Sequence, residues 1–277
     1  MIVQHNMSAL NTNRQLGGTN KLLANSTEKL SSGYRVNRAA DDAAGLSISE
    51  KMRGQIRGLS QASTNAQDGQ SLIQTAEGAL AEIHSVIQRM RELTVQASND
   101  TNVSADRKAI SLELAALSSE IDRIASQTEF NTMKLLDGTF SDKKLQVGAN
   151  TSQLIAISIS KMNTTALSIK AEDIAGVVST GAAADSVTVL ISVVNAALSL
   201  VSQQRSKLGA IQNRLDHTIA NADNMAENLQ SSESKIRDVD MAKEMVTYSA
   251  KSILQQAGQS MLAQANQATQ GVLSLLR

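Results

Sequence analysis

The stretch VTVLISVVNAALSLVSQQRSKLGAIQNRLDHTIANADNMAENLQSSESKI, Val187 to Ile236, carries an apolar residue at every seventh position. These positions are Val187, Val194, Val201, Leu208, Leu215, Ala222, Leu229 and Ile236. The positions three residues after each of these form a second row, and five of its eight residues are also apolar. A seven-residue repeat of this length is typical of a left-handed coiled coil, because it keeps one seam turned toward a partner helix. It predicts a helix of roughly 50 residues, about 75 Å long at about 1.5 Å per residue.

The N-terminal half contains a matching pattern, which predicts a partner helix from about Ala43 to Ala97. One seven-residue row is Met52, Leu59, Ala66, Ile73, Leu80 and Ile87. The second row is Ala62, Gly69, Ala76, Ile83, Met90 and Ala97, and its small residues permit close approach of another helix.

Three further segments complete the predicted fold. A helix from about Ser104 to Ser126 has one apolar face, with Ser104 as its expected N-cap. Alternating apolar residues between Gly138 and about Ile169 predict short β-hairpins. The glycine- and alanine-rich segment Ala171 to Asp185 is expected to be a loop. The fold is therefore predicted to be mainly α: an elongated antiparallel coiled-coil bundle with a small β-hairpin patch and paired terminal arms.

The composition favours helix packing over a thick globular core. Aromatic residues make up 1% of the chain, and proline and cysteine are absent. Proline is the strongest helix breaker, so its absence fits long helices, and without cysteine there is no disulfide or thiolate metal site. The formal net charge is zero, which gives no support to a nucleic-acid partner. No apolar run reaches 18 residues, so no membrane span is expected, and the first residues lack the pattern of a secretory signal.

The two ends of the chain carry little charge. Ser252 to Gln267 contains no charged residue, and Lys251 is the only charge between Met245 and Leu276. Apolar stripes run along both arms: one is Ile2, Ala9, Leu16, Leu23 and Leu30, and the other is Val239, Ala242, Val246, Ala250, Ile253, Ala257, Met261, Ala265, Ala268, Val272 and Leu275. Most helix stability in proteins comes from packing such a face. We expect the arms to bury each other's stripes and to pack against copies of the chain; the alternative is an ordinary amphipathic helix in a monomer core.

Catalytic patterns are lacking. His5, His84 and His217 are widely separated, and no HExxH, GxSxG or P-loop motif occurs. The carboxylate pairs Asp41–Asp42 and Asp238–Asp240 lie beside predicted helix starts, where negative charge is favourable in any case. We therefore expect no enzymatic activity, no cofactor and no metal site.

Several motifs together resemble bacterial flagellin along nearly the whole chain. They include SALNTNRQL, EKLSSGYRVNRAADDAAGLSISEKMRGQIRGL, QDGQSLIQTAEGAL, QRMRELTVQA, TEFNTMKLLDG, SQQRSKLGAIQNRLDHTIAN, ESKIRDVDMAKEM and SMLAQANQ. The resemblance implies an inner layer of residues 1 to about 44 with about 237 to 277, and a second layer of about 45 to 236 with hairpins at about 138 to 170. The large variable outer domains of many flagellins are missing.

The resemblance also implies a structural subunit that polymerises into the extracellular flagellar filament and serves swimming. Export would proceed unfolded through the flagellar type III apparatus without a cleaved signal peptide, and the arms would fold on polymerisation. The implied partners are copies of the chain, an export chaperone at the C-terminal arm, filament cap and hook-junction proteins, and the host Toll-like receptor for flagellin. The alternatives are a related axial protein, such as the hook–filament junction subunit, and a signalling coiled coil.

Two sets of residues follow as candidate sites. The receptor patch implied by the resemblance is Arg89, Leu93 and Glu113. The segment between Gly33 and Gly45 links the N-terminal arm to the bundle, and its polar residues are expected to contact neighbouring subunits. Together with the arm stripes, the expected subunit interface comprises Leu16, Leu23, Leu30, Arg35, Arg38, Asp41, Asp42, Ile253, Ala257, Met261, Leu262, Ala265, Val272 and Leu275.

Overall fold

The computed structural model describes the chain except residues 1–4, 173–177, 179–183 and 276–277, and for 184–188 and 269–275 it describes the backbone alone. The chain divides into two compact units, Met1–Ile56 with Glu227–Arg277, and Arg57–Ala226. The division predicted at residues 44 and 237 stays a prediction. The mainly α fold, with a helical bundle and small antiparallel strand pairs, is confirmed.

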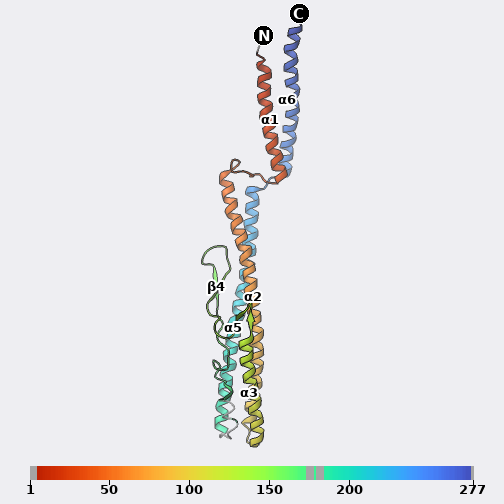
Figure 1. Cartoon of the computed structure of the whole chain (residues 1–277). Helices are drawn as coiled ribbons and strands as arrows, with labels where there is room; N and C mark the ends of the chain where they lie inside the picture. Colours follow the sequence, from red (N-terminus) through yellow and green to blue (C-terminus); the bar gives the residue numbers. More distant parts are fainter. Residues whose placement is uncertain (1–4, 173–177, 179–183, 276–277) are drawn as a thin grey trace. The chain divides into compact units, whose positions relative to one another are not determined.

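Three long helices supply most of the unit Arg57–Ala226: parts of α2 (Ala43–Ala97) and α5 (Ala184–Arg237), and all of α3 (Ser104–Gln127) (Figure 1). The bounds predicted for α2 are confirmed. Both of its heptad rows are buried from Leu59 onward. The α5 row is buried from Val194 to Ala222 and only half-buried at Leu229. Gln70 on α2 donates a hydrogen bond to Asp216 on α5 at 3.0 Å, so these two helices are partners within this unit.

The start of α3 differs by one residue from the prediction. Ser104 is the first helical residue, and Val103 occupies the N-cap position in place of Ser104. The Asp106 carboxylate accepts a hydrogen bond from the Val103 backbone N–H at 3.3 Å, which supplies half of a capping box from inside the helix. The N-cap expected at Ser104 is therefore wrong by one residue.

Two small hairpins lie against α2. The predicted one is β3 (Lys143–Gln146) paired with β4 (Leu154–Ile157), with Leu145 opposite Ile155. Gly69 allows Leu145 to pack on α2, since a Cβ at this glycine would lie 2.4 Å from Leu145 Cδ2. The second hairpin, β1 (Glu129–Phe130) with β2 (Met133–Lys134), was not predicted. Its strands have two residues each, which is too short for an alternating pattern to be visible.

The loop prediction for Ala171 to Asp185 is wrong wherever it can be compared. Ala171, Glu172, Val178, Ala184 and Asp185 are helical, and the other residues of this segment lie outside the described part of the chain. Alanine has the highest helix propensity, and it dominates the end of this segment.

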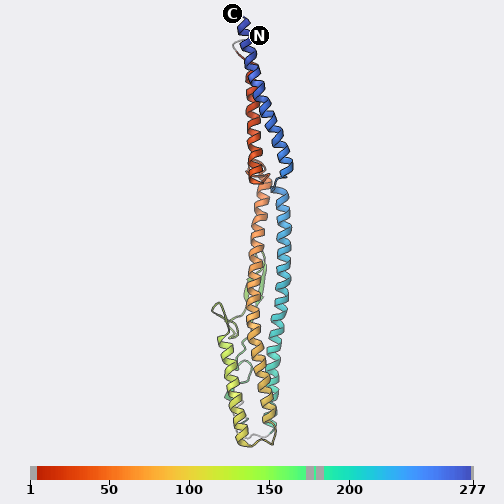
Figure 2. The same ribbon diagram turned by 90° about the vertical axis from the view of Figure 1, so that its right-hand side faces the viewer.

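The other unit contains the two arm helices, α1 (Met7–Ser32) and α6 (Met241–Leu275), side by side and antiparallel (Figures 1 and 2). Gly33 ends α1 in the left-handed conformation at φ 74°, and its N–H donates to the Lys29 carbonyl at 2.9 Å. Such a C-cap glycine is the commonest way to stop a helix. Within the described residues, no helix is long and apolar enough to cross a membrane.

Candidate assembly surfaces

The inward face of α1 is the apolar stripe that the sequence predicted. Leu16, Leu23 and Leu30 are half-buried and spaced by seven. Leu16 Cδ1 lies 3.2 Å from the position that a Cβ on Gly258 of α6 would take, so this leucine fills a hole made by a glycine. The predicted burial of the α1 stripe is therefore correct for these three residues, whereas Ile2 of the stripe lies outside the described residues.

Polar contacts fix the register of the two arms. The Asn6 amide donates to the Ala265 carbonyl at 3.0 Å, and the Lys251 ammonium donates to the Ser26 hydroxyl at 2.8 Å. A third bond runs from the Gln255 amide to Asn20 at 2.9 Å. These bonds place Lys251, Gln255 and Ala265 on the face of α6 that meets α1.

The predicted apolar stripe of α6 does not face α1, and the expectation of mutual burial is wrong for this helix. Val246, Ile253 and Met261 are 71%, 65% and 58% exposed, and Leu254 and Ala257 are exposed beside them. At about 100° per residue, Ile253 lies about 200° around the helix from Gln255, which faces α1. Of the α6 residues predicted at a subunit interface, Leu262 and Ala265 are half-buried. The side chains of Val272 and Leu275 lie outside the described residues.

The α6 helix therefore carries two faces. One face combines small and apolar residues, Gly258, Leu262 and Ala265, and it packs against α1 of the same chain. The other is apolar and uncharged, and nothing in the described chain covers it. Monomeric proteins rarely leave a contiguous apolar patch exposed unless it binds something.

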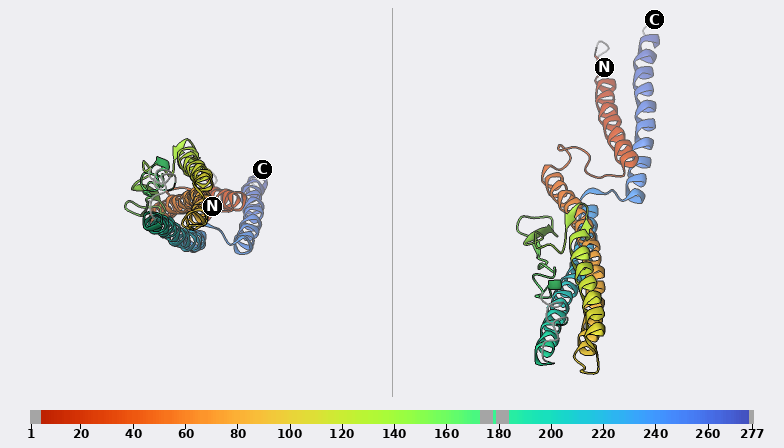
Figure 3. Two further views of the ribbon diagram at one scale, coloured as in Figure 1. Left: turned by 90° about the horizontal axis from the view of Figure 1, so that it is seen from below. Right: turned by 60° about the horizontal axis from the view of Figure 1, so that its bottom comes forward.

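The linker after α1 is joined to the segment that precedes α6 (Figure 3, right). The Arg35 N–H donates to the Arg237 carbonyl at 2.7 Å, and the Val239 N–H donates to the Gly33 carbonyl at 3.0 Å. The Arg237 guanidinium lies 4.5 Å from the centre of the Tyr34 ring, within the range of a cation–π contact. Val36 is fully buried, so the linker is an ordered connection.

Each polar linker residue named in the sequence analysis has a partner in the same chain. The Arg35 guanidinium donates to the Ile236 carbonyl, and the Arg38 guanidinium forms an ion pair with Glu28 at 2.9 Å. The Asp42 carboxylate accepts from the Gly45 N–H at 2.8 Å and so caps the start of α2. The prediction that these residues also contact neighbouring subunits stays open.

Asp41 organises the turn of the linker. Its carboxylate accepts backbone N–H bonds from Arg38 at 2.9 Å and from Asn37 at 3.2 Å. These two bonds favour the ionised form, and they hold the pKa of Asp41 below its ordinary value of 3.8.

We predict that the ionised Asp41 carboxylate stabilises the folded chain and that this stabilisation is lost in acid. Because the folded-state pKa lies below the unfolded one, the stabilisation is complete above the unfolded pKa and is lost as the pH falls through the folded pKa. The urea midpoint of Asp41→Ala should therefore fall below that of the parent chain at about pH 7, and by less at a pH below the ordinary value of 3.8. A difference of the same size at both pH values would contradict this role of the carboxylate.

A second polar cluster joins α2 to α3. Arg89 donates from Nη2 and Nε to Glu113 Oε1 at 2.9 and 3.1 Å, and from Nη1 to Glu92 Oε2 at 3.1 Å. The hydrogen bonds that Arg89 donates to Glu113, and secondly to Glu92, raise the pKa of Arg89. Both side chains of the Arg89–Glu113 pair remain about half exposed.

Leu93 is not available at this surface, although the sequence placed it in the receptor patch. It is only 2% exposed and belongs to the core of the bundle. Spacing by four put it on the same side of the helix as Arg89, but at Leu93 that side packs into the core. Leu93 is therefore not exposed beside Arg89 in the single chain, and its part in the receptor patch stays a prediction.

Three of the remaining candidates for chemistry, Asp42, Asp240 and His84, have partners within the chain. Asp42 and Asp240 cap helices, the latter by accepting from the Lys243 N–H at 3.1 Å. His84 Nε2 lies 3.1 Å from the Gln88 amide nitrogen one helical turn away. Among the described residues, no group of three or more histidine, aspartate or glutamate side chains could hold a metal ion.

Some interface features had no clear signal in the sequence. The Tyr34–Arg237 contact and the Glu28–Arg38 pair depend on how the linker folds back. Tyr34 could have been singled out, since it is one of only four aromatic residues.

Comparison with known families covers most of the chain. Residues 3–141 match the family described as bacterial flagellin N-terminal helical region, and residues 191–276 match the family described as bacterial flagellin C-terminal helical region. The chain is 55% identical over 279 residues to a flagellin of Halalkalibacterium halodurans and 51% identical over 304 residues to a flagellin of Bacillus subtilis. It is 50% identical over 287 residues to flagellin FlaB2 of Treponema pallidum. In each case both chains are covered in full.

Solved structures share the fold at low sequence identity. A putative flagellar hook-associated protein from Vibrio parahaemolyticus is 11% identical and superposes with a TM-score of 0.63, covering 72% of this chain and 100% of its own. The Bacillus cereus protein FlgL is 15% identical with a TM-score of 0.55, covering 66% of this chain and 99% of its own.

Proposed function

The chain belongs to the bacterial flagellin family and is a subunit of the flagellar filament, which serves motility; from this premise we propose that filament growth proceeds by burial of the uncovered apolar stripe of α6. The stripe consists of Val246, Ala250, Ile253, Leu254, Ala257 and Met261, and it is called the α6 stripe below. The stripe is the observation that carries the proposal.

The junction-subunit and signalling alternatives are weaker. The relatives that match over their full length at about half identity are named flagellins, whereas the hook-associated structures share the fold alone.

The energetics favour assembly through the α6 stripe. Fully burying one leucine, isoleucine, valine or methionine side chain stabilises by about 1.5–3 kcal/mol. The stripe holds Val246, Ile253, Leu254 and Met261, all more than half exposed. Burial in a neighbouring copy also explains why this face carries no charge, since an unpaired charge there would have to be desolvated.

Seeded growth tests the proposal. Purified chain is added to sheared fragments of its own filaments, and polymer is measured by sedimentation and electron microscopy. Long filaments are expected above a critical concentration. A chain that stays monomeric with fresh seeds at every concentration would exclude the proposed assembly.

We propose the same stripe as the binding site of the export chaperone. An uncovered apolar helix face is prone to premature association, and a hydrophobic groove on a partner is a usual way to cover such a face. Export in an unfolded state through the flagellar type III apparatus, followed by assembly outside the cell, fits arms that obtain a full set of contacts only from other copies. Contacts with the filament cap and hook-junction proteins belong to the same proposal.

The role proposed for the protein is structural, without catalysis. The carboxylates that could suggest acid–base chemistry, Asp42 and Asp240, are engaged as helix caps. The arm surfaces hold amides, small residues and aliphatic side chains, which suit packing.

A second candidate role is recognition by a host receptor at Arg89 and Glu113. The pair lies across two helices, both side chains are about half exposed, and Glu92 holds the guanidinium from a second side. Surface ion pairs of this kind contribute only about 0–1 kcal/mol to stability. A rigidly held pair with so little effect on folding is free to serve recognition.

We predict that Arg89→Asp weakens activation of receptor reporter cells at least about tenfold without unfolding the bundle, because it replaces the central cation of the cluster and places like charges together. The measurement is the concentration of monomer that gives half-maximal reporter signal. Arg123→Asp is the matched control, since Arg123 pairs with Glu120 in a similar exposed arrangement on α3. Equal activation by the Arg89 variant and the parent chain would remove the receptor role.

A further inference from the structure

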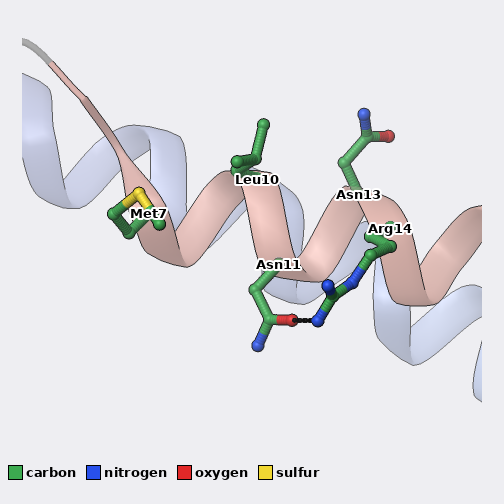
Figure 4. A pocket seen from close by; sticks show the side chains of 5 residues that line it. All are labelled: Met7, Leu10, Asn11, Asn13 and Arg14. Atoms are coloured by element: carbon green, nitrogen blue, oxygen red, sulfur yellow. Dashed lines mark hydrogen bonds between the residues drawn. The ribbon is translucent and has the colours of Figure 1, made fainter.

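A hollow on α1 and a hollow on the bundle differ in the side chains around them. The described residues around the first, a hollow of about 630 Å³, are Met7, Leu10, Asn11, Asn13 and Arg14 (Figure 4). All five come from α1, and Arg14 donates a hydrogen bond to Asn11 at 3.0 Å (Figure 4). Amides and a cation along one helix do not form the apolar enclosure that is typical of a small-ligand site.

The second hollow, called the bundle hollow below, lies in the unit Arg57–Ala226 where α2 meets both hairpins. Its volume is about 300 Å³, which is at the lower end of the range of small-molecule pockets. Six apolar side chains from α2, the two hairpins and the segment between them line it: Leu72, Phe130, Met133, Phe140, Leu145 and Ile157. A largely apolar wall built from separate elements is the common form of a ligand site.

Both phenylalanines of the chain are among these six residues. Phe140 is buried, Phe130 is half-buried, and Met133 is 40% exposed although it is apolar. Aromatic rings pack offset or edge-to-face against one another, and a thioether sulfur makes favourable contacts with a ring. This wall therefore suits an added aromatic ring.

Three charged side chains also line the bundle hollow: Lys143 and Lys144 of β3 and Asp68 of α2. All three are exposed, so they lie at its opening. Lys143 is paired with Ile157, and residues opposite each other in an antiparallel pair share one face of the hairpin. No ion pair among the described residues involves any of the three charged side chains. Two unpaired ammonium groups against one carboxylate leave an excess of positive charge at the opening, beside an apolar wall of low dielectric that strengthens its field.

We propose that the bundle hollow binds a small aromatic carboxylate, with its ring against Phe130, Met133 and Phe140 and its carboxylate beside Lys143 and Lys144. This inference goes beyond the filament function. The apolar wall accounts for the ring, and the excess of positive charge accounts for the anionic group. The carboxylate stays at the exposed opening, where it keeps much of its water and avoids the large cost of burying a charge. The competing accounts are that the lysine stems themselves cover the apolar wall, and that a second copy of the chain fills the hollow.

Fluorine NMR gives a local measurement of binding, because a chain labelled with 4-fluorophenylalanine carries fluorine only at the two phenylalanines of the hollow. The full-length monomer is titrated with 4-phenylbutyrate, with butyrate and with the neutral 4-phenyl-1-butanol. We expect 4-phenylbutyrate to shift at least one of the two signals in a saturable way. The alcohol should bind about threefold more weakly and butyrate at least about tenfold more weakly, since each lacks one half of the recognised structure. A chain labelled with 3-fluorotyrosine is the control: Tyr34 and Tyr248 lie in the other unit, and their signals should not follow the same saturation curve.

Charge variants at the opening test the anionic group. Lys143→Met and Lys144→Met each keep a long apolar side chain and remove its charge, and each should weaken binding about threefold, the effect of an exposed ion pair. Asp68→Asn should strengthen binding about twofold, because it removes the opposing carboxylate. Lys108→Met is the matched control, since Lys108 is exposed on α3 and does not line the hollow, and it should leave the affinity unchanged. Circular dichroism checks that each variant stays folded.

Unchanged affinity in the double variant, Lys143→Met with Lys144→Met, would overturn the proposed carboxylate site. Phenylalanine signals that do not move, or that move only in step with the tyrosine signals, would overturn it as well. If the monomer does not bind 4-phenylbutyrate and its phenylalanine signals shift on polymerisation instead, a second copy fills the hollow and the inference is wrong. Seeded growth of the parent chain tests the filament function separately, so failure of the carboxylate site leaves that function intact.

Discussion

Replacing Ile253 with aspartate abolishes filament growth at concentrations where the parent chain polymerises fully. Ile253 lies in the middle of the α6 stripe and is 65% exposed in the single chain. The monomer therefore tolerates the charge, and a change at such an exposed site alters stability by about 0.5 kcal/mol or less. In the filament the carboxylate would be buried among aliphatic side chains without a partner. Removing the carboxylate from water in this way costs roughly several kcal/mol. The expected rise in critical concentration is more than about a hundredfold, since each 1.4 kcal/mol or so is a factor of ten.

Sedimentation after seeding measures this effect, and circular dichroism of the unseeded chain checks that the subunit stays folded. Leu200→Asp is the matched control, because Leu200 is also a large aliphatic residue exposed on a long helix but lies outside the arms. It should leave the critical concentration within a few fold of the parent value. Normal growth of Ile253→Asp filaments would show that the stripe remains exposed to water in the polymer.

Replacing Ile83 with alanine produces the largest expected loss of subunit stability. Ile83 is fully buried in the second heptad row of α2, within the apolar core shared by α2, α3 and α5. Truncation removes buried methyl and methylene groups and leaves a cavity that the surrounding helices fill only in part. The free energy of unfolding should fall by about 2–5 kcal/mol.

Urea denaturation of the monomer at neutral pH, followed by circular dichroism, measures this loss. Val95→Ala on the same helix is the control, because Val95 is about half exposed and its truncation should cost about 0.5 kcal/mol or less. Similar losses in the two variants would mean that the heptad row of α2 is not the seam of the bundle.

Much of the fold could be read from periodicity. The seven-residue rows of α2 and α5 gave the location of both helices. The rows are buried from Leu59 onward in α2 and from Val194 to Ala222 in α5. Alternation likewise located the β3–β4 hairpin. The β1–β2 hairpin escaped because two-residue strands carry no period, and the start of α3 shifted because Asp106 caps it from within.

The candidate surfaces were less predictable. Arg89 and Glu113 are 24 positions apart, and their 2.9 Å contact depends on how α2 and α3 pack. Leu93 shares a helix side with Arg89, yet it is buried, because one side of a helix can be covered at one turn and open at the next. Spacing along a single helix contains no information on where its neighbour ends.

The sequence by itself determined that this chain forms long helices with neutral arms at both ends, because heptad spacing, the absence of proline and the scarcity of charge act locally on each segment. Only the tertiary structure decided which side of α6 meets α1. Lys251 is the only charge on that helix from Met245 to Leu275, so charge along the helix does little to select the side that meets α1. The choice depends on the fit of Leu16 into Gly258 and on the bonds from Lys251 and Gln255, which form only when both helices are in place. That choice leaves the more apolar side of α6 exposed for another copy.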